Sequence, residues 1–271
     1  PAGCRKYLTE EIKKAGAHSP DVILLPSDIL LPPSAQSLRR QGFMLDLCRQ
    51  ELSRLAEDLR ELPSLLFVGL PVSLHGVTVS AMAALRQGEL LGFVLPPSVP
   101  EGPLPEGFLP ASAVFEAGGA RLRVLPGYDA GKALQYGSLA GGCDCLLLPC
   151  YEPAKVGSAD RAEQALSVLS RELGCAAVLC CGAGSDSSHP VCYRGFAVIA
   201  EAGETVSVQA EFGQSASLCY DIDLDIVRRS RDTLPAAPAP AAYRFPAVPH
   251  DYALRSFSST PYLPMEPEAE R

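Results

Sequence analysis

The segment from Leu122 to Pro153 places the tightest constraint on the fold of this chain. Two apolar runs, Leu122–Leu125 and Cys145–Leu148, are typical of buried strands, and a helical pattern lies between them. A Pro-Gly turn follows the first run. A strand, a sharp turn, a helix and a strand in this order indicate an α/β fold, in which the residue at the turn can present a nucleophile. Here that residue is Gly127, which has no side chain.

The composition is that of a folded domain with a sizeable core. The chain has 271 residues, of which 47% are hydrophobic and 20% are charged. Its net charge of −8 argues against nucleic acid or an anionic membrane surface as a partner, because both require clustered Lys and Arg. No apolar run approaches the roughly 20 residues needed to span a bilayer. The N-terminus lacks a charged segment followed by an apolar one, so we expect a cytoplasmic protein with no membrane partner.

Helical and strand patterns alternate along most of the chain. They predict helices at 5–17, 34–62, 160–174 and 224–231, and strands at 21–25, 65–72, 77–85, 89–95, 176–181, 194–200, 204–210 and 217–222, with two further short strands within 115–124. Ser34 is the predicted N-cap of the second helix. Residues 96–110 contain six prolines and are expected to form an irregular loop.

Two strand–helix–strand halves with hairpins predict the architecture. Apolar strands separated by helices require sheets that helices cover, and a four-layer α-β-β-α sandwich buries every such run. The tail from Leu234 is too rich in Pro and Ala for a packed element. We therefore predict an α/β domain over 1–233 and a C-terminal extension or linker over 234–271.

The ten cysteines of the chain do not form a metal-binding pattern. None of their spacings is the paired C-x-x-C of a zinc site, and only His189 lies near any of them in sequence. In a cytosolic chain, cysteines on apolar runs behave as small core residues. We expect that role for them and no metal site; a reactive thiol or a metal ligand is the alternative.

Several short motifs follow one another in a characteristic order. They are L-P-S-D at 25–28, G-L-P at 69–71, G-E-L-L-G at 88–92, L-P-P-S-V-P at 95–100, G-Y-D at 127–129, P-A-K-V-G at 153–157, a glycine-rich loop at 182–185, D-I-D-L at 221–224 and S-S-T-P-Y-L-P at 258–264. Their order resembles the nitrilase, or carbon-nitrogen hydrolase, family. More narrowly, it resembles the N-terminal glutaminase domain of glutamine-dependent NAD synthetase, over nearly the whole chain.

The resemblance implies a catalytic site that this chain has lost. In the family, a cysteine thiolate attacks a carboxamide, a glutamate acts as general base and a lysine stabilises the oxyanion. The glutamate position falls on Ser27, the lysine position on Pro96 and the cysteine position on Gly127. None of these side chains can perform the family's role at its position.

The resemblance also implies positions that bind substrate, and one position from which the chemistry could be rescued. Glu106, Tyr128 and Cys150 occupy the implied substrate-binding positions. Cys150 lies near the carboxyl end of a strand, where α/β sheets place ligands, so it is also the candidate for a migrated nucleophile. His189 or Glu152 would then be its base.

These observations lead to one main hypothesis and two alternatives. The main hypothesis is an inactive glutaminase-like domain of an NAD synthetase homologue, which packs on a synthetase domain and forms a homo-oligomer. In the family, this domain supplies ammonia for the amidation of nicotinate adenine dinucleotide. The resemblance implies no cofactor in this domain, and ATP only in an attached synthetase domain. The alternatives are an active amidohydrolase that uses Cys150 and a non-catalytic module for small-molecule binding or oligomerisation.

Overall fold

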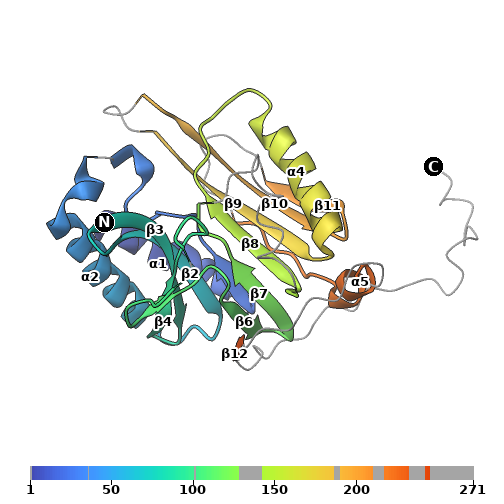
Figure 1. Ribbon diagram of the computed structural model, residues 1–271, viewed down its shortest axis with the longest axis horizontal. Helices are drawn as coiled ribbons and strands as arrows, with labels where there is room; N and C mark the ends of the chain where they lie inside the picture. Colours follow the sequence, from blue (N-terminus) through green and yellow to red (C-terminus); the bar gives the residue numbers. More distant parts are fainter. Residues whose placement is uncertain are drawn as a thin grey trace, which may run out of the picture.

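Two β-sheets lie face to face at the centre of the molecule, and helices cover their outer faces (Figure 1). The computed structural model describes residues 2–35, 37–100, 102–127, 142–185, 190–209, 217–231 and 242–244. The predicted α-β-β-α sandwich is confirmed. No helix within these residues is long and apolar enough to cross a membrane.

The first sheet is built from the N-terminal half of the chain. Its elements are α1 (Ala2–Gly16), β1 (Val22–Leu24), the 3₁₀ turns η1 (Pro33–Ala35) and η2 (Leu38–Arg40), α2 (Gly42–Asp58), β2 (Leu65–Leu74), β3 (Val77–Arg86), β4 (Glu89–Val94) and β5 (Phe108–Leu109). The strand order is β1-β2-β3-β4-β5. β1 runs parallel to β2, and β2, β3 and β4 form the predicted antiparallel meander. The carboxyl ends of β1, β2 and β4 therefore lie at the same edge of the sheet.

The second sheet follows in the chain. Its elements are β6 (Val114–Ala117), β7 (Ala120–Val124), β8 (Cys145–Cys150), α4 (Ser158–Leu173), β9 (Ala176–Gly184), β10 (Tyr193–Glu201), β11 (Glu204–Gln209), α5 (Leu224–Arg229) and β12 (Ala242–Arg244). The strand order is β11-β10-β9-β8-β7-β6-β12. β7, β8 and β9 are parallel, so their carboxyl ends share one edge. The predicted helical pattern between β7 and β8 falls outside the described residues.

Three buried apolar clusters separate the four layers. One lies between the helices α1 and α2 and the first sheet, and a second lies between α4 and the second sheet. The third lies between the two sheets, where the Phe67 and Phe115 rings meet edge to face at 5.2 Å. Along β2, Leu66 and Val68 face the helices while Leu65 and Phe67 face the other sheet. Both faces of the strand are buried, as its continuous apolar run requires.

Three local predictions were wrong. The helix predicted for 34–62 begins only at Gly42, and Ser34 lies in η1 rather than at an N-cap, because Gln41 adopts an extended conformation that interrupts the helix. Residues 217–222 form no strand; the chain instead leads to Asp223, which caps α5 by accepting hydrogen bonds from the N–H groups of Asp225 and Ile226. The loop 96–110 contains β5, which pairs with β4.

The second sheet extends into the predicted C-terminal extension. Residues 242–244 form β12, which pairs in parallel with β6. The other residues of 234–271 lie outside the described part of the chain. The short strand therefore attaches part of the extension to the edge of the sandwich.

Candidate functional site

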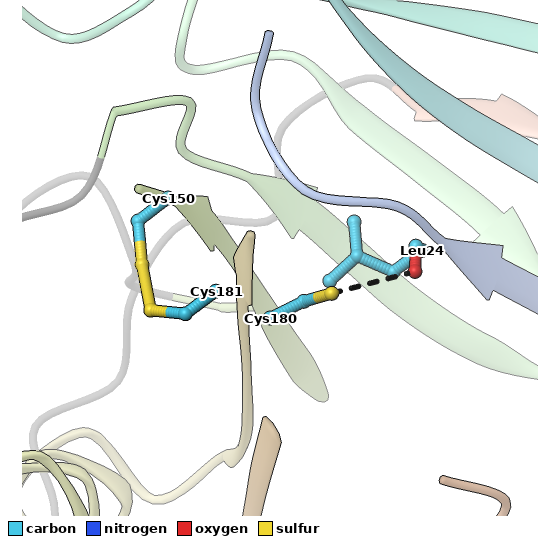
Figure 2. Close-up of a disulfide and its surroundings, with 4 residues drawn as sticks. All are labelled: Leu24, Cys150, Cys180 and Cys181. Carbon is cyan, nitrogen blue, oxygen red and sulfur yellow. Dashed lines mark hydrogen bonds between the residues drawn. A yellow bond between two sulfur atoms is a disulfide. The ribbon is translucent and has the colours of Figure 1, made fainter. Parts of the chain in front are cut away.

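The carboxyl ends of strands from both sheets meet at one end of the sandwich. The Cys180 thiol of β9 donates to the Leu24 carbonyl oxygen at the end of β1, with 3.7 Å between sulfur and oxygen (Figure 2). This contact places the carboxyl edges of the two sheets side by side. Ser27, Pro96 and Gly127 follow β1, β4 and β7, so the three positions implied by the resemblance lie at this shared end.

The segment that carries Ser27 crosses directly over β2. A side chain at Gly69 would overlap the backbone of residues 26–28, so a glycine is required for this close approach. Ser27 is buried, with 3% of its surface exposed. A serine hydroxyl in this position cannot act as the carboxylate base of the family.

The other two positions also lack a reactive group. Gly127 is exposed, and its N–H donates to the Pro149 carbonyl oxygen at 3.1 Å, beside the end of β8. Its φ of +71° is left-handed, and no described atom lies within 4 Å of a Cβ built on it. The backbone thus turns sharply at the position that the resemblance assigns to the nucleophile, and Gly127 presents no side chain there. Pro96 is buried and carries no cation.

A buried ionic cluster that sequence analysis missed lies beside Ser27. Asp28 accepts a hydrogen bond from the Ser80 hydroxyl at 2.6 Å, and its other oxygen lies 3.0 Å from Nη1 of Arg39. Arg39 also donates to the Ser80 hydroxyl and to the Leu31 carbonyl. Burial raises the pKa of Asp28, against the charge of Arg39 and the hydrogen bond from Ser80. The carboxylate is therefore held by Ser80 of β3 and Arg39 of η2.

Two tyrosines from the second sheet pack at the same end. The Tyr151 and Tyr193 rings meet edge to face at 5.3 Å. Burial raises the pKa of the Tyr151 phenol, and the nearby charge of Asp28 adds to that effect. Burial also raises the pKa of the Cys180 thiol to about 12, which keeps this thiol protonated near neutral pH and weakly nucleophilic.

Cys150, the candidate for a migrated nucleophile, is bonded to Cys181 of β9 (Figure 2). Both cysteines belong to the apolar cluster under α4, on the face of the sheet that points away from the other sheet. The two cysteines are core residues, as predicted, but they form a disulfide that the sequence analysis did not predict. The Cys150 sulfur is not available as a nucleophile while the bond is intact. Cys48, Cys143, Cys145 and Cys175 are buried and not disulfide-bonded, as predicted for core residues.

Four predicted residues remain, namely Glu106, Glu152, Tyr128 and His189. Glu106 is exposed in the loop before β5, and Glu152 is partly buried after β8. Tyr128 and His189 lie outside the described residues. Within the part of the chain that the structure describes, no group of His, Cys, Asp and Glu side chains is arranged to hold a metal ion.

Comparisons of sequence and of structure give different results. No protein-family profile matches the sequence, and neither does any curated protein. The structure is similar to a carbon-nitrogen hydrolase from Helicobacter pylori G27, with a TM-score of 0.65 at 14% identity, over 85% of this chain and 87% of that one.

Two glutamine-dependent NAD synthetases are also similar in structure. The enzyme from Acinetobacter baumannii has a TM-score of 0.62 at 20% identity, over 79% of this chain and 41% of that one. The enzyme from Cytophaga hutchinsonii has a TM-score of 0.62 at 15% identity, over 76% of this chain and 37% of that one. The chain thus spans about two fifths of the length of these synthetases.

Proposed function

Since the chain has the fold of the nitrilase superfamily, we propose that it is a glutaminase-like domain of an NAD synthetase homologue whose own amidase site is inactive. The observation that carries the proposal is the shared end of the two sheets. There, Ser27, Pro96 and Gly127 follow β1, β4 and β7. In this proposal the three residues occupy the family's catalytic positions and carry side chains that cannot perform the family's roles.

The chemistry of amide hydrolysis supports the inactive reading. A covalent mechanism needs a nucleophile that attacks the carbonyl carbon, a base that takes its proton and a donor that stabilises the oxyanion. Gly127 offers no nucleophile, Ser27 offers no carboxylate and Pro96 offers neither a cation nor an N–H group. The free thiol of Cys180 is protonated, and the Asp28 carboxylate is already paired with Arg39.

The extent of the structural match supports a role beside a synthetase domain. The chain is similar to about two fifths of each of two NAD synthetases, which leaves room in those proteins for further domains. The expected partner is a synthetase domain, covalently attached or separate, and the ATP of the reaction would bind there. Ammonia for such a synthetase would then come from solution or from another protein. A homo-oligomer built through the faces of the sandwich remains part of this proposal.

The test is ammonia release from glutamine by the purified chain. We expect no release above the blank, and no covalent label from a thiol-reactive glutamine analogue in mass spectrometry. A matched set of variants, Cys150→Ala, Cys180→Ala and Cys145→Ala, identifies the source of any activity. Release that Cys150→Ala or Cys180→Ala abolishes, while Cys145→Ala preserves it, would contradict the proposal and reveal a migrated nucleophile.

A gain-of-function variant tests the three positions directly. The combined substitution Ser27→Glu, Pro96→Lys and Gly127→Cys restores the family's residue types at the shared end. If these three residues occupy the family's catalytic positions, the analogue should label position 127 in this variant and leave the parent chain unlabelled. Equal labelling of a folded variant with Gly127→Cys alone would mean that Ser27 and Pro96 do not occupy the proposed positions.

A further inference from the structure

The Cys150–Cys181 disulfide joins two neighbouring parallel strands near their carboxyl ends. In the register of β8 and β9, Cys150 lies directly opposite Cys181, and their Cα atoms are 4.8 Å apart. Cys150 and Cys181 have 3% and 6% of their surfaces exposed. Both ends of the bridge are therefore buried, Cys181 slightly less than Cys150.

The residue that precedes each cysteine contacts the shared end of the sheets. The Pro149 carbonyl accepts the hydrogen bond from the Gly127 N–H. The Cys180 thiol points to the opposite face from the bridge and donates to Leu24 of β1 (Figure 2). One neighbour thus holds the vacated nucleophile position, and the other joins the two sheets.

The residues that follow the cysteines contact each other. The Tyr151 ring lies against Gly182 so closely that a Cβ at Gly182 would overlap it. The same ring meets Tyr193 of β10 edge to face. Any change in the separation of β8 and β9 at the bridge must therefore change the packing of Tyr151.

We propose that the Cys150–Cys181 bridge is a reversible redox site that controls the geometry of the shared end of the sheets. The proposed reductant is a dithiol. One of its thiolates attacks Cys181 Sγ and forms a mixed disulfide, and the S–S bond breaks with Cys150 as the leaving thiolate, which takes up a proton. The second thiol of the reductant then displaces Cys181 and closes a cyclic disulfide. The protein gains two electrons and two protons, and the dithiol loses them.

Reduction increases the distance between the two sulfur atoms. A disulfide holds its sulfurs about 2 Å apart, whereas non-bonded heavy atoms settle at about 3.5 Å or more. The two side chains lie on adjacent strands under α4, so the change must be absorbed by rotation of the side chains or by separation of the strand ends. Separation of the strand ends would act on Pro149, Tyr151 and Gly182. This proposal goes beyond the proposed function and does not depend on glutamine turnover.

The absence of tryptophan provides a direct readout. The chain has nine tyrosines and no tryptophan, so tyrosine packing and the disulfide itself are the main sources of its near-ultraviolet circular dichroism, and the Tyr151 variant below separates the two. The experiment maps the cysteines by alkylation and mass spectrometry, with and without dithiothreitol, and records the spectrum and the melting temperature of the same samples. We expect dithiothreitol to release Cys150 and Cys181, to change the tyrosine signal and to lower Tm on the order of 5–10 °C. Reoxidation should restore both signals.

Three variants separate the bridge from the other thiols. The double variant Cys150→Ser with Cys181→Ser should melt near the reduced parent and should not respond to dithiothreitol. Cys145→Ser, on the same strand but on the other face, should respond as the parent does. Tyr151→Leu should keep the Tm response and lose most of the change in the tyrosine signal.

Two results would overturn the proposal. One is a protein, purified without reductant, in which Cys150 and Cys181 are both alkylated without prior reduction. The other is cleavage of the bridge, shown by mass spectrometry, with no change in either the tyrosine signal or Tm. Neither result bears on the glutaminase assay, so the two proposals fail independently.

Discussion

The Asp144 carboxylate and the Arg231 guanidinium lie 2.8 Å apart and attach the segment after α5 to the residue before β8. Arg228 of α5 pairs with the same carboxylate at 3.1 Å, and the Arg121 N–H donates to it as well. Only 3% of the Asp144 side chain is exposed. Because Asp144 is buried while Arg228 and Arg231 are partly exposed to solvent, Asp144→Ala should cost about 2 kcal/mol of folding free energy through the loss of charged hydrogen bonds.

Urea unfolding measures this loss, and an exposed ion pair provides the control. Arg60 and Glu57 lie 4.0 Å apart on the surface of α2. Glu57→Ala should change the free energy of unfolding by no more than about 0.5 kcal/mol. Equal effects of the two substitutions would mean that Asp144 does not hold α5 in place.

Acidification should lower the contribution of Asp144 to the free energy of unfolding and raise that of Asp28, because their pKa values are shifted in opposite directions. Burial raises the pKa of Asp144, but the hydrogen bonds from Arg228 and Arg121 and the charges of the arginines outweigh burial and hold it below the usual value. The unfolded chain therefore binds the proton more tightly, and this stability is present above about pH 4 and lost as the pH falls through the lower folded pKa. For Asp28, burial raises the folded pKa, so its contribution falls as the pH rises above about 4.

Unfolding in urea between pH 3 and pH 7 tests these signs. Asp144→Asn should lose less stability than the parent on acidification, because it lacks the group with the lowered pKa. Asp28→Asn should lose more, because it lacks the group that gains a proton on folding. If the free energy of unfolding falls equally on acidification in both variants and the parent, the directions given for the two pKa shifts are wrong.

There is space for a side chain at Gly127, but the backbone there has a left-handed φ that residues other than glycine adopt at a cost in free energy. Its left-handed φ of +71° costs a non-glycine residue about 1–2 kcal/mol, although no described atom would meet the added Cβ. Gly127→Ala and Gly127→Cys should therefore destabilise the domain by similar amounts in chemical denaturation. Gly102→Ala, at a position without a left-handed φ and with open space around it, is the matched control and should be close to neutral.

Gly69 should tolerate no side chain at all. An added Cβ would overlap backbone atoms of residues 26–28, which cannot move as a flexible side chain can. We expect Gly69→Ala to cost about 3 kcal/mol or to prevent folding. Gly42→Ala, at the start of α2 with no described atom within 4 Å, should be neutral or stabilising by up to about 1 kcal/mol. Comparable melting temperatures for the two variants would contradict the crossing of β2 by the Ser27 segment.

The elements that depend on local signals were predictable from the sequence. The β2–β3 and β3–β4 hairpins turn at His75-Gly76 and Gln87-Gly88, where both residues of each turn have positive φ. The helix that ends at Gly174 also follows its apolar stripe. The start of α2 was not predictable in this way, because the apolar pattern continues across the extended residue Gln41.

The contents of the candidate site depend on contacts between distant residues. Asp28 belongs to a motif recognised in the sequence, but its partner Ser80 lies 52 positions away and is brought near only by the register of β3. Cys150 and Cys181 are separated by 31 positions, and nothing in that spacing indicates pairing before β8 and β9 are aligned. The assignment of catalytic positions to Ser27, Pro96 and Gly127 by resemblance stays a prediction, and the resemblance did not indicate the groups around them.

The three apolar clusters between the layers do not include Ser27, Pro96 or Gly127. The apolar contacts that hold the four layers together are therefore made by other residues. A substitution at one of these three positions would leave those apolar contacts in place.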